Sequence, residues 1–116
     1  MIDRLIYVET EKEKYPMIFN FNVLEAIQEE YGSFIKWDEL IENDQEPNFK
    51  ALKFGLREAI NEGIDMENEG LEIKRPLVTD KQVGRILTEI GFRNAAGVIK
   101  TAVVAGSNGG DQEEKN

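Results

Sequence analysis

The sequence predicts an α+β fold that is mostly helical, with an N-terminal β-hairpin packed on four to five helices. Two observations lead to this prediction. Two short segments rich in β-branched and aromatic residues, 5–8 and 15–19, flank a charged stretch, which is the pattern of a hairpin. Beyond them, apolar residues recur at three- and four-residue intervals between Asn, Ser or Thr caps and glycine stops, which is typical of amphipathic helices.

The hairpin is expected to be short and to lie at an edge. Its connection at 9–14 contains no Asn-Gly or Asp-Gly pair, so the turn should be longer than two residues. Pro16 has no N–H to donate, which is compatible only with an edge strand or a strand start. Because a lone hairpin is marginal in water, helices must cover its apolar face.

Two helices follow the hairpin. We expect Asn22 to cap the first and Gly32 to end it, and Ser33 to cap a shorter second helix. The stretch 38–46 then carries five acidic residues and no basic one. This stretch is either a solvated helix end and loop or a site for a cation or a basic partner. The apolar positions of the two helices are Val23, Leu24, Ile27 and Tyr31, then Phe34, Ile35, Trp37, Leu40 and Ile41.

The third helix is predicted to open at Asn48 and to stop at Gly63, because Phe49, Leu52, Leu56, Ala59 and Ile60 recur at helical spacing. Phe54 lies off this stripe, and it either packs under the hairpin or points outward as a partner contact. The segment 64–76 has no helical or strand period, so we expect a loop. That loop is either passive and mobile or a segment that becomes ordered on binding.

A fourth helix is predicted at 80–90, capped by Thr79 and closed by Gly91. The segment 92–104 is rich in small residues, and it is either an internal packing helix or a self-association face of a homo-oligomer. We expect one globular domain at 1–105 and a disordered acidic tail at 106–116, which has little to bury.

The charge of the chain limits the classes of partner that we expect it to bind. The 116 residues include 14 basic and 23 acidic ones, a formal net charge of −9. The basic residues do not cluster in the sequence, so nucleic acid and anionic membrane are not expected partners. The charge serves solubility or attracts a specific basic partner. No signal peptide and no membrane-spanning run is recognisable, so a cytoplasmic location is expected.

The residue types present argue against catalysis. The sequence contains neither His nor Cys, which removes the usual neutral-pH proton carrier and every thiolate-based site. No window matches a calcium-binding EF-hand loop. The glycine-rich segment 106–110 lacks the strand, lysine and helix of a phosphate-binding loop. We therefore expect no enzyme, no catalytic residue, no metal site and no cofactor.

Several short patterns together carry a family resemblance. They are Tyr-Pro-x-x-Phe-Asn at 15–20, Glu-Glu-Tyr-Gly-Ser at 29–33 followed by Trp37, and Thr-Asp-Lys-Gln-Val-Gly-x-Ile-Leu at 79–87 followed by Gly91. In these features the chain resembles the small tail assembly chaperones of long-tailed phages and prophages of Gram-positive hosts. The resemblance covers roughly 5–104.

The resemblance implies a mostly helical protein that binds the tape measure protein, and in some members the tail tube protein, before leaving the finished particle. The alternative is a structural tail-completion or neck protein that stays in the virion; an enzyme or a regulator is the least favoured reading. For a chaperone, we expect a groove among the helices that carry the large apolar residues. The predicted partner-binding residues are Trp37, Phe54, Phe92 and Phe34.

Overall fold

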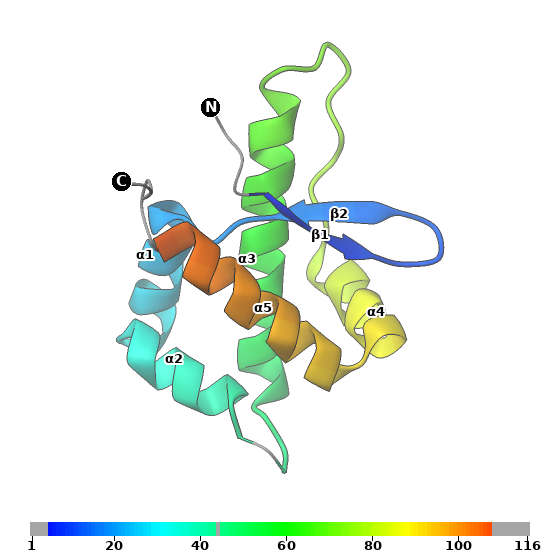
Figure 1. The fold of residues 1–116 in the computed structure, drawn as a ribbon. Helices are drawn as coiled ribbons and strands as arrows, with labels where there is room; N and C mark the ends of the chain where they lie inside the picture. Colours follow the sequence, from blue (N-terminus) through cyan, green and yellow to red (C-terminus); the bar gives the residue numbers. More distant parts are fainter. Residues whose placement is uncertain (1–4, 44, 108–116) are drawn as a thin grey trace.

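The computed structural model describes residues 5–43 and 45–107. Within them it contains one antiparallel hairpin followed by five helices (Figure 1), which confirms the mostly helical α+β fold. The elements are β1 (Ile6–Glu9), β2 (Lys14–Met17), α1 (Phe21–Tyr31), α2 (Phe34–Ile41), α3 (Phe49–Asn68), α4 (Asp80–Ile90) and α5 (Phe92–Ser107).

The hairpin forms as predicted, with a loop of four residues between its strands. Ile6 pairs with Met17 and Glu9 with Lys14 in antiparallel register. The loop is closed by Thr10, whose N–H donates to the Glu13 carbonyl at 2.8 Å and whose hydroxyl lies 3.1 Å from the same oxygen. The inner face of β2 is buried against α3, so helical cover supplies the stability that a free hairpin lacks.

Helix α3 is the axis of the fold, and β2 and the other four helices all pack against it (Figure 1). One face of α3 carries a small residue at every fourth position, and all four are buried: Ala51, Gly55, Ala59 and Gly63. Residues four apart lie on the same face of a helix. This small-residue face therefore lets other parts of the chain approach the α3 backbone closely.

The upper half of the small-residue face receives strand β2 and the residue that follows it. A Cβ atom added at Gly63 would lie only 2.7 Å from the carbonyl carbon and oxygen of Pro16. One turn earlier, the Ala59 carbonyl accepts a hydrogen bond from the Ile18 N–H at 3.2 Å. The chain leaving β2 is thus bonded directly to the helix backbone, which a larger side chain at Gly63 would prevent.

The lower half of the face receives the ring of Trp37 from α2. An added Cβ at Gly55 would collide with this ring. The Trp37 indole N–H donates to the Ala51 carbonyl at 2.8 Å, and the side chain is fully buried. A buried indole needs such a partner, so α2 is held to α3 by both shape and a hydrogen bond.

The prediction that the third helix stops at Gly63 is wrong, because α3 continues to Asn68. Gly63 is a contact point rather than a terminator. Ile64, four residues after Ile60, continues the buried apolar stripe and is fully buried. Tertiary burial of these positions outweighs the weak helix preference of glycine. The predicted loop therefore begins only after Asn68.

The connection between α3 and α4 follows the surface of α3, where two asparagines hold it. The side chain of Asn68 donates to the Arg75 carbonyl at 2.8 Å and accepts from the Arg75 N–H at 2.9 Å. Asn61, two turns earlier, makes the same two-way bond with the backbone of Val78, at 3.1 and 2.8 Å. These four bonds satisfy backbone groups that no regular element pairs.

The helix caps largely follow the sequence. Gly32 and Gly91 end α1 and α4 with φ of 90° and 85°, and Thr79 forms a capping box with Gln82 at the start of α4. The expectation for Asn22 is wrong. Asn20 caps α1 by accepting from the Val23 N–H, which starts the helix at Phe21.

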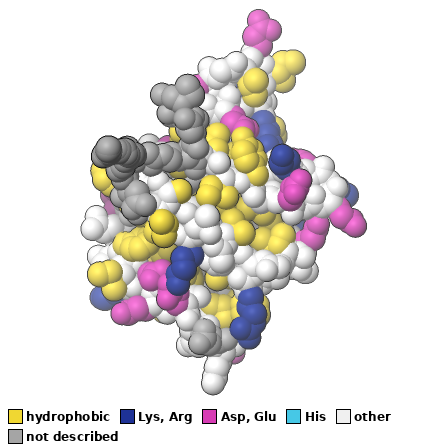
Figure 2. Space-filling view, in the orientation of Figure 1, with side chains coloured by type: hydrophobic (Ala, Val, Ile, Leu, Met, Phe, Trp, Pro, Cys, Tyr) yellow, Lys and Arg dark blue, Asp and Glu magenta, His cyan; other side chains and the backbone are white. Residues whose placement is uncertain are grey.

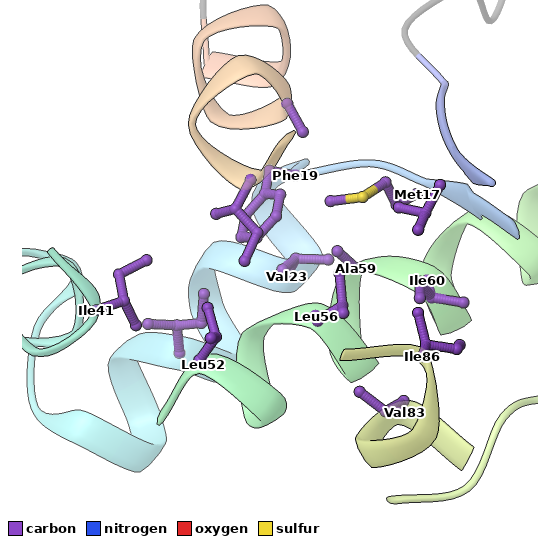
Figure 3. Packing of buried hydrophobic residues seen from close by; sticks show 14 of the residues in the cluster. Met17, Phe19, Val23, Ile41, Leu52, Leu56, Ala59, Ile60, Val83 and Ile86 are labelled. Atoms are coloured by element: carbon purple, nitrogen blue, oxygen red, sulfur yellow. The ribbon is translucent and has the colours of Figure 1, made fainter. Parts of the chain in front are cut away.

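Two corrections concern the apolar residues. Phe49, expected in the buried stripe of the third helix, is 53% exposed because it is the first residue of α3 and lies beyond the packed turns. Phe19, expected at the end of a strand, follows β2 and is fully buried. Figure 3 shows the core in which side chains of α1, α2, α3 and α4 meet the hairpin. Its labelled residues include Phe19, Val23, Ile41, Leu52, Leu56, Ile60, Val83 and Ile86.

Helix α5 extends to Ser107, so the predicted boundary at 105 cuts through its last turn. Three of its residues, Ala95, Ile99 and Ala102, are buried, and Gly106 lies so close to the Phe19 carbonyl that a Cβ atom there would clash. The predicted tail therefore does not include 106 and 107. Its remaining part, 108–116, lies outside the described residues.

Among the helices of the described residues, none has both the length and the apolar composition needed to cross a membrane.

The close approach at Gly63 can be tested by adding one methyl group. Gly63→Ala should destabilise the fold by about 1–3 kcal/mol, because its Cβ would overlap the rigid Pro16 backbone. Gly97→Ala is the matched control on α5, where an added Cβ meets nothing within 4 Å, and it should stabilise by about 0.5–1 kcal/mol. Urea unfolding followed by circular dichroism measures both, and equal effects would contradict the packing described.

Candidate functional site

The main candidate site is a groove of about 480 Å³ between α2 and α5. The α2 wall of the groove is formed by Phe34, Asp38, Ile41 and Glu42. They share one face because Asp38, Ile41 and Glu42 follow Phe34 by four, seven and eight positions. Two of these side chains are apolar and two are acidic. Pro47, from the connection to α3, closes one end.

The α5 wall of the groove is apolar at its two ends and small in the middle. Phe92 lies at the start of the helix and Val103 with Val104 toward its end, while Ala96 and Gly97 lie between them. Val104 is 54% exposed. Since space above Gly97 is open, a large side chain of a binding partner can enter there.

One charged cluster crosses the groove. Lys100 of α5 reaches Glu42 of α2, with 2.9 Å between Nζ and Oε2. Asp38 lies one turn before Glu42 on the same wall and is half-buried. No basic side chain of the described residues forms an ion pair with Asp38. Figure 2 shows acidic and basic side chains side by side among the apolar ones on this face.

The charged cluster shifts the pKa values of its three members in different directions. Burial, together with the like charge of Glu42, raises the pKa of Asp38, and a protonated Asp38 can donate a hydrogen bond to Glu42. The hydrogen bond from Lys100 lowers the pKa of Glu42. The same bond raises the pKa of Lys100. Asp38 is therefore the carboxylate whose charge is least compensated.

Two of the four predicted partner-binding residues meet in this groove. Phe34 and Phe92, which are 58 positions apart in the sequence, line its opposite walls, and both are partly buried. Phe34 also lines a shallower hollow with Phe21 and Leu24 of α1. The apolar surface therefore extends from α5 across the start of α2 to α1.

Trp37 belongs to the core. Its side chain is fully buried, with its ring 5.4 Å from that of Phe34 and 5.8 Å from that of Phe19, measured between centroids. It supports the groove wall from behind and offers no surface to a partner in this conformation. Its position between Phe34 and Ile41 at helical spacing was the sequence signal for burial.

Phe54 faces a second cleft, formed by α1, α3 and the start of α4. Its ring packs edge-on against that of Tyr31, with 5.5 Å between the ring centroids. Phe54 therefore packs against α1 and not under the hairpin. Phe49 lines the same cleft and also contacts Phe92, with 5.9 Å between ring centroids. The Phe49–Phe92 pair thus joins the second cleft to the groove.

The second cleft also corrects the expectation that basic residues do not cluster. Lys50, Lys53 and Arg57 all line it, because they lie at helical spacing on α3. Lys53 and Arg57 share one carboxylate, that of Asp80, at 3.3 and 3.2 Å. Most of this basic charge is therefore used inside the fold, where it ties α4 to α3.

Several exposed apolar residues escaped the sequence analysis. Ile73 is 88% exposed in the connection between α3 and α4, and Phe21 is 81% exposed at the start of α1. Among the groove residues, Val104, Asp38 and Lys100 were not singled out. The prediction of Phe34 as a partner-binding residue and the five-acid stretch at 38–46 were the sequence signals that pointed to the α2 wall.

In the part of the chain that the structure describes, no group of three or more acidic side chains is arranged to hold a metal ion. Comparisons of the chain with models of protein families, with curated proteins and with solved structures find no match. The function is therefore inferred from the surface of the protein and from the resemblance in the sequence.

The charged cluster makes a titration prediction. Glu42→Gln should lower the pKa of Asp38, because it removes a like charge and leaves Lys100 available to Asp38. Glu39→Gln, a change at the neighbouring residue, should lower the pKa of Asp38 less, since the charge of Glu39 affects Asp38 less than that of Glu42 does. Carboxyl carbon shifts followed by NMR against pH measure both. An Asp38 pKa that stays unchanged or rises in Glu42→Gln would contradict this geometry.

Proposed function

We propose that the protein is a phage or prophage tail assembly chaperone that binds the tape measure protein during tail building, with the tail tube protein as a second candidate partner. The observation that carries the proposal is the groove between α2 and α5, lined by Phe34 and Phe92 from opposite walls. A chaperone of the family that the sequence resembles would need such a surface to bind its partner.

The shape and lining of the groove suit a helical partner. Amphipathic helices bind proteins by laying an apolar stripe into a groove between helices. Here the walls carry Phe34, Ile41, Phe92 and Val103, and the small residues of α5 leave room between them. A tape measure protein is long and largely helical, so it would offer many such stripes.

The acidic charge suits the same role. Unassembled tape measure protein would expose apolar surface and aggregate, and a chaperone that covers it must keep the complex in solution. A net charge of −9 on 116 residues supplies repulsion between complexes. The role is one of binding rather than catalysis, and it needs no metal or cofactor.

The proposal is tested by co-expression with the tape measure protein of the same genome. A chaperone should increase the soluble fraction of that protein and co-purify with it. Val104→Gln should weaken the complex by about fivefold, because Val104 offers exposed apolar area on the groove wall. Co-purified yield and calorimetry on the purified pair measure the effect.

Ile73→Gln is the control, since Ile73 is also an exposed aliphatic residue but lies in the connection after α3 and outside the groove. It should leave the affinity within about twofold. If the tape measure protein stays insoluble and none co-purifies with the unchanged chain, the proposal is wrong.

A second measurement distinguishes a chaperone from the alternative function, a structural protein that stays in the virion. Mass spectrometry of purified virions should find a chaperone absent, whereas a tail-completion or neck protein would be present in stoichiometric amount.

A further inference from the structure

We propose that the segment bound in the groove is a helix whose apolar stripe is flanked by arginine or lysine, placed so that this cation pairs with Asp38. The inference rests on the proposed helix-binding role of the groove and specifies the chemistry of the partner. It depends on three properties of the groove walls.

The first property is that Asp38 forms no ion pair with a basic side chain of the described residues, although Lys100, which pairs with Glu42, offsets part of its charge. The cations of the facing wall are already engaged, since Lys100 pairs with Glu42 at 2.9 Å and the Arg93 guanidinium lies 5.4 Å from the centre of the Phe92 ring. The Asp38 carboxylate is half-buried beside the carboxylate of Glu42. A partner cation is thus the one group that would complete the cluster.

The second property is that Asp38 already favours a compensating positive charge. Burial and the nearby Glu42 carboxylate raise the pKa of Asp38, so the site holds a proton more tightly than a free carboxyl does. A guanidinium or ammonium group brought by the partner would supply the same compensation.

The third property is the position of Asp38 relative to the apolar surface. On α2 it lies between Phe34, one turn before, and Ile41, about one turn after. A helix that places apolar residues over Phe34 and Ile41 would therefore bring the flank of its stripe to Asp38. The overall charge agrees, because a chain with a net charge of −9 attracts basic partners.

The test uses the full chain and two synthetic helical peptides of about 20 residues, a length that supports a stable helix. Both peptides carry the same leucine and alanine stripe; one has arginine on the flanks and the other has glutamate. Fluorescence anisotropy of the labelled peptides gives their affinities. The arginine peptide should bind at least about tenfold more tightly than the glutamate peptide.

Two variants that each remove one negative charge then test whether Asp38 causes the preference for the arginine peptide. Asp38→Asn should weaken binding of the arginine peptide by about five- to tenfold, because it removes the half-buried carboxylate and keeps the shape. Glu39→Gln removes the same charge from the same helix but outside the groove lining, and should change the affinity by less than about twofold. Circular dichroism checks that both variants keep the wild-type helix content.

Three results would overturn the inference: equal affinity for the two peptides, equal losses in the two variants, and binding of neither peptide. The co-expression experiment distinguishes these from failure of the proposed function. If tape measure protein co-purifies with the unchanged chain and with Asp38→Asn to the same extent, the chaperone role stands and the basic flank is wrong. If it never co-purifies while the peptide preference holds, the groove chemistry stands and the chaperone role is wrong.

Discussion

The close approach of other segments to the backbone of α3 is the constraint on which the rest of the fold depends. Along one face of this helix, Ala51, Gly55, Ala59 and Gly63 leave no side chain large enough to keep neighbours away. The Trp37 ring occupies the space at Gly55, and the backbone of Pro16 and Met17 occupies that at Gly63. Two hydrogen bonds to α3 carbonyls, from the Trp37 indole and the Ile18 N–H, complete these contacts.

The groove is a consequence of this packing. Because Trp37 is drawn into the core, the face of α2 next to it carries Phe34, Asp38 and Ile41 outward to the facing helix. Helix α5 is fixed at its far end by the contact of Gly106 with the Phe19 carbonyl. Between these fixed points the small residues of α5 do not fill the space, so two apolar walls remain partly exposed.

Charge pairing differs between α3 and α2, and this difference affects which partners the protein would bind. On α3 the basic side chains of Lys53 and Arg57 are neutralised by Asp80 and serve to hold α4. At the groove, Asp38 and Glu42 share the cation Lys100, which forms its ion pair with Glu42. Binding of a basic helix would compensate Asp38 and part of the net charge of −9.

Local interactions made much of the fold predictable. The fold class, the hairpin and the ends of helices at Gly32, Ser33, Thr79 and Gly91 depend on contacts within a few residues, so short patterns are enough to find them. The expectation that one apolar face of the hairpin needs helical cover follows from its small size.

Other features depend on residues that are distant in sequence. Gly63 has the same local signature as a helix stop, and only its contact with Pro16 makes it a packing position. Phe34, Trp37, Phe54 and Phe92 looked alike as large apolar residues, yet Trp37 fills the core, Phe54 faces the second cleft, and the other two line one groove.

The sequence by itself thus determined the elements, most of their caps and the acidic charge of the chain, because composition and short-range spacing carry that information. The tertiary structure alone decided which aromatic side chains remain accessible and that Lys100 forms its ion pair with Glu42 rather than with Asp38. The physical reason is that burial and charge pairing are set by the neighbours that packing on α3 brings together, and these neighbours lie far apart along the chain.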